Sequence, residues 1–259
     1  MKKVISANNQ VIRSLKKLKE KKYRDVENAY LIEGLNLFEE ALKTGCDILT
    51  ICINSSLKDR ESFDMLLSDR LKAKTIIVPD PIFGELTETV NPQGIIVAVR
   101  KKEHQQNDNK SRFVVLDRLQ DPGNVGTVIR TAEAAGFGSI IAVKGTADIY
   151  SSKVIRAAAG SLFRINILEA PDSIWVFDYL KNIDVTLYAC DGNGEIEYYN
   201  ADLQANIGIV VGNEGNGISS FFLDKCKTIS IPMNDDAESL NVAVAAGIVI
   251  YESVRQNGL

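Results

Sequence analysis

The chain has 259 residues, a formal net charge of −4 at pH 7 and 25% charged residues. This length provides for one large or two ordinary domains, and the composition is that of a globular protein, not of a disordered chain. The slight acidic excess excludes a uniformly basic nucleic-acid-binding protein but leaves room for a local basic segment.

The sequence predicts neither a membrane segment nor a metal site. No apolar stretch approaches the ~18–20 residues that cross a bilayer, and no apolar segment of a signal peptide follows the first lysines. We therefore expect a cytoplasmic protein. The four cysteines form no C-x-x-C pair, and the sole histidine, His104, lies in a polar stretch. Disulfides, bound metal and catalysis by histidine are accordingly not expected.

Basic residues dominate the N-terminal segment, where only Glu20 opposes them before Asp25. Such a cluster can follow a phosphate backbone, but charge alone favours a solvated helix face. The residues are Lys2, Lys3, Arg13, Lys16, Lys17, Lys19, Lys21, Lys22 and Arg24.

The first hundred residues alternate short apolar runs with helix-like segments. Strands are expected at 29–33, 48–54, 74–79 and 94–99, and helices at 34–45 and 60–73. This pattern indicates a small α/β domain over residues 1–100. The polar stretch 101–111, which contains His104, reads as a linker to a second domain over residues 112–259.

The second domain contains six short runs rich in valine and isoleucine. Helix-like segments separate them, at 123–136, 151–161 and 172–182, and a last helix is expected from about Ser239 to Gln256. Strands buried on both faces with helices between them predict a mostly parallel sheet. The runs are 112–117, 139–144, 162–168, 184–191, 207–214 and 227–233.

The first candidate motif is the turn Asp121-Pro122-Gly123-Asn124, after which Asn124 is expected to cap a helix. At ~100° per residue, Arg130 falls opposite the apolar arc of that helix. Its destination is open at this point: solvent, a bound anion or a second chain. The arc consists of Val125, Val128, Ile129, Ala132 and Ala135.

The second motif, at 207–219, is a buried strand that runs into a glycine-rich loop containing Glu214. Gly212, Gly215 and Gly217 would let backbone groups approach a ligand, and ligands of open α/β sheets lie beyond the carboxyl ends of strands. The loop lacks the phosphate-binding signatures, so a plain turn is the alternative.

The third motif begins the last helix. Ser239 is a natural helix N-cap, and Asn241 stands in the first turn of an otherwise apolar helix, where a buried amide would need partners. That helix is apolar nearly all round, so it should be enclosed in a core or at an interface. Its apolar residues include Val242, Val244, Ile248, Val249 and Ile250.

Taken together, the three motifs resemble the SpoU/TrmH class of SPOUT RNA ribose methyltransferases. They read Asn124-x-Gly126-x-x-x-Arg130-Thr131-Ala132, then Gly212-Asn213-Glu214-Gly215-x-Gly217, then Ile231-Pro232-Met233 with Ser239-Leu240-Asn241-Val242. The resemblance covers roughly 113–256. More loosely, residues 1–100 are similar to the small α/β RNA-binding domain that often precedes this catalytic domain.

The resemblance implies a six-stranded, largely parallel sheet with a C-terminal trefoil knot, a homodimer, and S-adenosylmethionine as cofactor. It implies that the cofactor is bound by Gly212, Ile231, Met233, Leu240 and Asn241. Arg130 would serve an active site shared between subunits, as a general base or as a clamp on phosphate and alkoxide; a guanidinium normally stays protonated, which favours the clamp. Asn124, Glu214, Ser239 and Asn241 would position the reacting groups.

The leading hypothesis is thus an S-adenosylmethionine-dependent RNA 2′-O-ribose methyltransferase. The two-domain layout favours ribosomal RNA by family analogy, with transfer RNA as the alternative. A non-catalytic RNA-binding relative is a second class, which the complete motif set disfavours. A Rossmann oxidoreductase is disfavoured because the first strand–helix turn lacks G-x-G-x-x-G.

Overall fold

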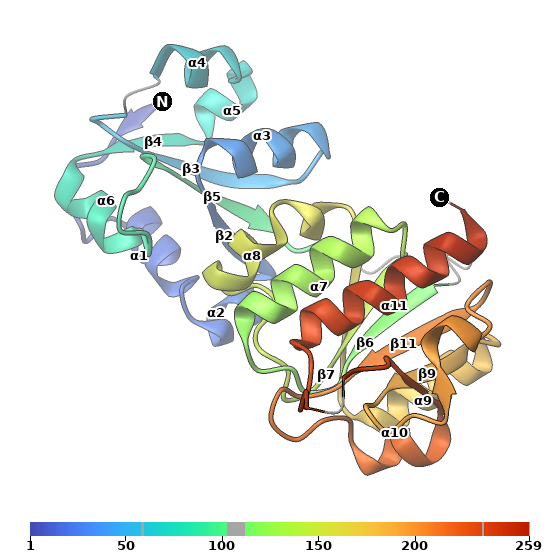
Figure 1. The fold of residues 1–259 in the computed structure, drawn as a ribbon. Coiled ribbons are helices and arrows are strands. Elements are labelled where there is room, and N and C mark those ends of the chain that lie inside the picture. Colours follow the sequence, from blue (N-terminus) through green and yellow to red (C-terminus); the bar gives the residue numbers. More distant parts are fainter. Residues whose placement is uncertain (58–59, 103–111, 235, 259) are drawn as a thin grey trace. The chain divides into compact units, whose positions relative to one another are not determined.

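The computed structural model describes the chain except residues 58–59, 103–111, 235 and 259 (Figure 1). The expected linker at 101–111 therefore lies almost wholly outside the described residues. The chain divides into two compact units, one made of residues 1–103 with 150–155, the other of residues 104–149 with 156–259. No helix of the described part is long and apolar enough to cross a membrane.

The N-terminal unit is built on a mixed sheet of order β1-β4-β3-β5-β2. β1 and β3 run parallel to β4, whereas β5 runs antiparallel to β2 and β3. The strands are β1 (Lys2–Lys3), β2 (Ala29–Glu33), β3 (Ile48–Asn54), β4 (Thr75–Val78) and β5 (Ile95–Arg100). The helices are α1 (Gln10–Lys17), α2 (Lys21–Glu27), α3 (Leu35–Lys43), α4 (Arg60–Met65), α5 (Asp69–Ala73) and α6 (Asp80–Leu86).

Part of the basic N-terminal segment has a structural role. Arg24 is only 6% exposed and donates to the carbonyls of Leu18 at 2.8 Å and Lys19 at 2.6 Å, so it closes the turn between α1 and α2. Lys16 pairs with Glu85 of α6. These two cations hold the fold together, and neither is a free phosphate ligand.

The C-terminal unit contains a seven-stranded sheet of order β10-β12-β9-β11-β6-β7-β8, in which every pairing is parallel. The strands are β6 (Arg112–Leu116), β7 (Ser139–Val143), β8 (Asn166–Ala170), β9 (Thr186–Cys190), β10 (Ile196–Glu197), β11 (Ile207–Val211) and β12 (Lys227–Ser230). The expected number of six strands was wrong by one. β10 is the addition; its two residues are too few to show any hydrophobic period.

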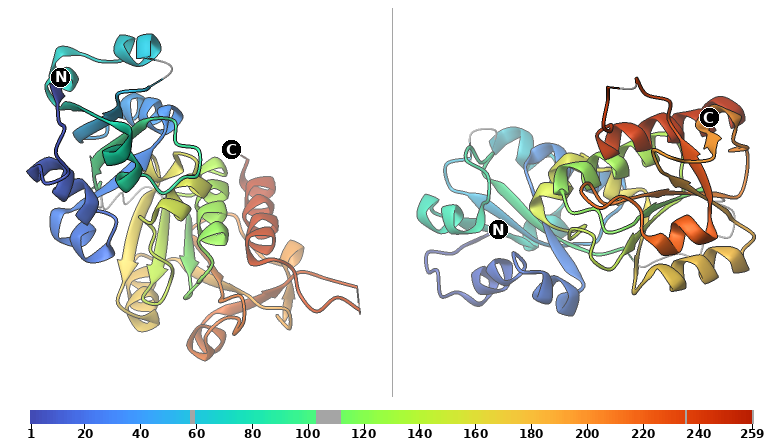
Figure 2. Two further views of the ribbon diagram at one scale, coloured as in Figure 1. Left: turned by 90° about the vertical axis from the view of Figure 1, so that its left-hand side faces the viewer. Right: turned by 60° about the horizontal axis from the view of Figure 1, so that its bottom comes forward.

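Helices cover both faces of this sheet (Figure 2). α7 (Pro122–Ala134) and α11 (Val242–Asn257) lie side by side on one face, and α9 (Ser173–Asn182) and α10 (Ser220–Lys225) cover the other. Side chains of alternating strand residues enter one core with α9 and α10, for example Phe113 and Val115. The arc predicted for α7 is confirmed, since Val125, Val128, Ile129, Ala132 and Ala135 are all buried.

Candidate active site

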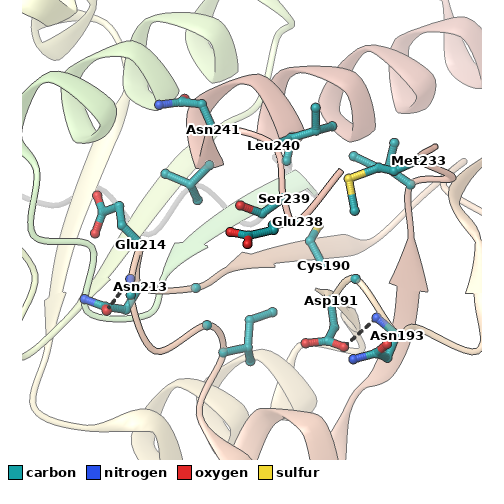
Figure 3. Close-up of a pocket in the computed structure, with 18 of the residues that line it drawn as sticks. Cys190, Asp191, Asn193, Asn213, Glu214, Met233, Glu238, Ser239, Leu240 and Asn241 are labelled. Atoms are coloured by element: carbon teal, nitrogen blue, oxygen red, sulfur yellow. Dashed lines mark hydrogen bonds between the residues drawn. The ribbon is translucent and has the colours of Figure 1, made fainter. Parts of the chain in front are cut away.

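A cavity of about 580 Å³ opens beyond the carboxyl ends of β9, β11 and β12 (Figure 3). Three segments far apart in sequence line it: the turn after β9, the glycine-rich loop after β11, and the stretch from β12 to the start of α11. Parallel strands leave such a crevice at this edge of a sheet. The lining residues are Cys190 to Asn193, Gly212 to Gly215, Gly217, Ile218, Ile229, Ile231, Met233, Glu238 to Val242, and Ala245.

The cavity brings together most of the residues predicted for the site. All five predicted cofactor residues line it, namely Gly212, Ile231, Met233, Leu240 and Asn241. Of the predicted catalytic residues, Glu214, Ser239 and Asn241 line it as well, whereas Asn124 and Arg130 do not.

The glycine-rich loop is a tight turn that depends on its glycines. Asn213 and Gly217 exchange two backbone hydrogen bonds of 2.9 Å, and Gly217 has a φ of +66°. A Cβ on Gly212 would lie closer than 3.0 Å to backbone atoms of Gly217. Within the turn, the Asn213 Oδ1 accepts from the N–H groups of Gly215 and Asn216 at 3.0 and 2.9 Å. The loop is therefore a fixed wall of the cavity.

Asp117, which was not among the predicted site residues, anchors this loop. Its carboxylate is fully buried, accepts from the Ser219 N–H at 2.7 Å and pairs with the Arg118 Nε at 3.0 Å. The Arg118 carbonyl in turn accepts from the Asn213 Nδ2 at 2.9 Å. A carboxylate directly after an apolar strand is the signal that could have revealed it.

The cap of α7 differs from the prediction. The helix begins at Pro122, a residue favoured at the first helical position, so Asp121 is the N-cap and accepts from the Asn124 N–H at 2.8 Å. The Asn124 side chain is thereby left for other partners. Its Nδ2 donates to the Glu214 Oε1 at 3.1 Å, and its Oδ1 accepts from the Asn241 Nδ2 at 3.0 Å.

The cap of α11 differs in the same way. Asn241, not Ser239, is the N-cap, and its Oδ1 accepts from the N–H groups of Ala243 at 2.9 Å and Val244 at 3.3 Å. The expectation of a buried amide was wrong, because Asn241 is exposed at the cavity. Ser239 is exposed and also lines the cavity.

Glu214 is the central acceptor of the site. Besides Asn124, it accepts from the backbone N–H groups of Gln120 at 3.0 Å and Asp121 at 3.1 Å. Partial burial raises the pKa of Glu214, but these hydrogen bonds favour the carboxylate and together hold the pKa below its ordinary value. Glu214 thus joins the turn before α7 to the glycine-rich loop as an anion.

Arg130 lies on α7 and is exposed, and its side chain makes no hydrogen bond or ion pair with any other residue that the structure describes. It stands six residues beyond Asn124, about 9 Å along the helix. The predicted outward orientation agrees with this exposure.

The cavity carries negative charge. Asp191, Glu214 and Glu238 line it, and no lysine, arginine or histidine is among its described lining residues. The Asp191 Oδ1 accepts from the Asn193 N–H at 2.8 Å, and burial raises the pKa of the neighbouring Cys190 thiol to about 12. Asp191, Asn193 and Glu238 were not predicted, since no periodicity distinguishes a loop carboxylate that lines a cavity from one in solvent.

The fold and the site define an α/β protein that binds a small cofactor beyond the carboxyl ends of parallel strands. More particularly, residues 111–251 match the model of the SpoU rRNA Methylase family, and the chain belongs to that family. Residues 9–97 match the MRM3-like substrate binding domain. The resemblance drawn from the three motifs is thereby confirmed.

Relatives and solved structures are similar along nearly the whole chain. The 23S rRNA (guanosine(2553)-2′-O)-methyltransferase RlmP of Bacillus subtilis is 36% identical, over 97% of this chain and 98% of its own. The AdoMet-bound rRNA methyltransferase from Sinorhizobium meliloti is 30% identical with a TM-score of 0.85, over 98% of this chain and 97% of its own. AviRb from Streptomyces viridochromogenes, in complex with AdoMet, is 26% identical with a TM-score of 0.88, over 96% of this chain and 98% of its own.

Proposed function

We propose that the chain is an S-adenosylmethionine-dependent RNA 2′-O-ribose methyltransferase that acts on ribosomal RNA. The observation that carries this proposal is the hydrogen-bonded bridge Glu214–Asn124–Asn241, which joins all three motifs at the edge of one acidic cavity. Family membership and the named 23S rRNA relative support both the reaction and the class of substrate.

The cavity suits this cofactor in size and charge. Its volume of about 580 Å³ lies in the range of small-molecule sites, and Ile231 and Met233 provide apolar surface. S-adenosylmethionine carries a net positive charge, which three lining carboxylates and no lining cation would favour. Gly212, Ile231, Met233, Leu240 and Asn241 would hold the cofactor, which supplies an activated methyl group when bound.

The chain's own residues would do the remaining work. Asn124 is fixed from both sides, so the start of α7 cannot move independently of the cavity. Arg130, which has no partner among the described residues, would bind the phosphate beside the target ribose and stabilise the developing 2′-alkoxide. We prefer this role to that of general base because a guanidinium stays protonated in proteins. Ser239, exposed at the cavity, would position the hydroxyl.

We further propose a homodimer through α7 and α11. α11 packs on α7 and leaves the apolar side chains of Val244 and Tyr251 52% and 50% exposed. A second copy would cover these side chains and place Arg130 beside the partner's cofactor. Val244→Lys should then halve the mass measured by light scattering and reduce methyl transfer; an unchanged mass would refute this interface.

The remaining assignments follow from the same reading. We propose a substrate-binding domain over 1–100, a linker over 101–111 and a catalytic domain over 112–259, all in the cytoplasm. We also propose a trefoil knot near the C-terminus. Its support is that the stretch before α11 lines one cavity with the loops after β9 and β11, and that α11 then returns to α7.

The test is ribose methylation of unmodified ribosomal RNA by wild type and Arg130→Ala. We expect the substitution to reduce turnover about 100-fold or more. Calorimetry should show that the variant still binds S-adenosylmethionine, because Arg130 does not line the cavity of its own chain. Lys225→Ala, at an exposed cation of α10, is the control. Full turnover by Arg130→Ala would refute its role, and absence of heat with wild type would favour a non-catalytic relative. Mapping 2′-O-methyl sites in a deletion strain separates ribosomal from transfer RNA.

A further inference from the structure

The N-terminal unit has a cavity of its own, of about 420 Å³, that no step of the methyl transfer uses. It lies between the start of α3, the loop after β3 and the turn before β5. Asn36, Asn54 and Gln93 bring amide groups to its wall, and Phe63 and Ile95 are buried apolar residues at its lining. All of these residues fall within the stretch 9–97 that matches the substrate-binding model.

Two of the amides are fixed with their NH₂ groups unpaired. The Asn54 Oδ1 accepts from the Ser56 N–H at 3.1 Å, and the Gln93 Oε1 accepts from the Leu35 N–H at 2.9 Å. Because the oxygens are engaged, the nitrogens Nδ2 and Nε2 remain as donors, and neither has a partner among the described residues. The wall therefore presents hydrogen-bond donors to whatever enters.

The backbone holds these amides rigidly. The Asn54 N–H donates to the Gly94 carbonyl at 2.8 Å, and the Gly34 N–H donates to the Ile95 carbonyl at 3.1 Å. Gly34 has a φ of +102°, and a Cβ there would lie 2.7 Å from the Gln93 Oε1. Glycine at this position is what allows Gln93 to reach the start of α3.

The lining selects the chemistry of the ligand. The described lining residues carry no charged side chain that could pair with a phosphate. Apolar surface together with donors fixed on one side fits a neutral planar ring that has acceptors along one edge. Nucleobases are such rings, and sequence-specific recognition of RNA mostly targets unpaired bases.

We propose that this cavity receives an unpaired nucleobase of the RNA substrate and that Asn54 and Gln93 donate to acceptors on its edge. The proposal rests on the proposed function for its choice of RNA. It assigns to the N-terminal unit a binding site for one nucleobase, distinct from the cofactor cavity.

The test compares Asn54→Asp with Asn91→Asp. Asn54→Asp keeps an oxygen for the Ser56 N–H and removes only the donor, while adding one negative charge. Asn91 is exposed, is not among the described lining residues and lies two residues from Gln93. Asn91→Asp adds the same negative charge outside the cavity and therefore controls for electrostatic repulsion of the RNA. Unmodified fragments of large-subunit ribosomal RNA are the probe, with Kd measured by fluorescence anisotropy and methyl transfer measured in parallel.

We expect Asn54→Asp to raise the Kd for the RNA about ten-fold, Asn91→Asp to change it less than two-fold, and both to keep wild-type affinity for S-adenosylmethionine. Gln93→Glu should behave like Asn54→Asp, which guards against a fold defect in one variant. Equal Kd values for Asn54→Asp and Asn91→Asp would overturn the proposal. The proposal would also be overturned if free guanosine or uridine monophosphate bound tightly and Asn54→Asp abolished that binding without changing the Kd for the RNA.

The two proposals fail separately. If wild type binds RNA in this way but transfers no methyl group, the proposed reaction is refuted and the base-binding cavity stands. If methyl transfer is normal and the three variants bind RNA as wild type does, the cavity is refuted and the reaction stands.

Discussion

The hydrogen bond between Asn124 and Asn241 is the most direct link between the first and third motifs, and Asn241→Asp removes it selectively. The aspartate retains an oxygen for the N–H groups of Ala243 and Val244, so the cap of α11 is kept. Only the Nδ2 that donates to Asn124 at 3.0 Å is lost. A neutral hydrogen bond contributes about 0.5–1.5 kcal/mol, and the exposure of Asn241 places this one in the lower half of that range.

A double-mutant cycle isolates this contribution. Asn124→Ala removes the acceptor, so Asn241→Asp made in that background has no bond left to break. The effect of the aspartate's charge on groups other than Asn124 is present in both backgrounds and cancels in the difference. We expect a coupling of about 0.5–1 kcal/mol in the free energy of unfolding.

Trp175 gives the assay its specificity. It is the only tryptophan of the chain, lies on α9 in the C-terminal unit, and stacks on Tyr179 with ring centroids 5.1 Å apart. Its fluorescence during urea unfolding therefore reports on the unit that holds the bridge. Thr127→Ala removes an exposed hydroxyl bonded to the Gly123 carbonyl on the same helix and should show no coupling to Asn241→Asp. Additive effects of Asn124→Ala and Asn241→Asp would refute the bridge.

Three further predictions concern the cavity. Gly212→Ala should cost about 1–3 kcal/mol and abolish measurable cofactor binding, because its Cβ meets backbone of Gly217; Gly215→Ala, whose nearest atom is 3.7 Å away, should do neither in calorimetry and urea unfolding. The pKa of Glu214 is lower in the folded state than its ordinary value of 4.5. The ionised Glu214 therefore contributes to folding stability above pH 4.5, and this contribution is lost as the pH falls through the lowered pKa. The gap in unfolding free energy between wild type and Glu214→Gln should therefore shrink below pH 4.5, and a constant gap would contradict this. Glu238→Gln should weaken binding of S-adenosylmethionine about two- to five-fold and leave binding of the demethylated product, which has lost the sulfonium charge, nearly unchanged, as titration of both ligands would reveal.

Much of the C-terminal fold follows from periodicity. The central strands β6, β7 and β11 are rich in valine and isoleucine and almost wholly buried, which makes such runs recognisable. Even there, Leu162 and Phe163, expected to begin a strand, lie in the short 3-10 helix Ser161–Phe163. Gly160, with a φ of +90°, begins that turn, and apolar content alone does not distinguish it from a strand.

The residues of the site could be predicted from the sequence, but the hydrogen bonds between them could not. The motifs named Asn124, Glu214 and Asn241, yet spacing could not show that one side chain lies between the other two. Asp117 was missed because its role depends on Ser219, 102 residues away in sequence. Long-range partners of this kind are fixed by sheet order, which no local pattern encodes.

The N-caps of α7 and α11 were both predicted at the wrong residue, and the observed caps explain how the site is held together. In each motif two polar residues compete for the N-cap, and because Asn, Asp and Ser are about equally favoured there, residue type does not decide between them. Pro122 moves the start of α7 back by three residues, so Asp121 takes the cap and Asn124 is released. At α11 the cap falls to Asn241, whose oxygen serves the helix while its nitrogen reaches Asn124. An asparagine can do both because its amide carries an acceptor oxygen and a separate donor nitrogen, whereas an ionised aspartate has no donor.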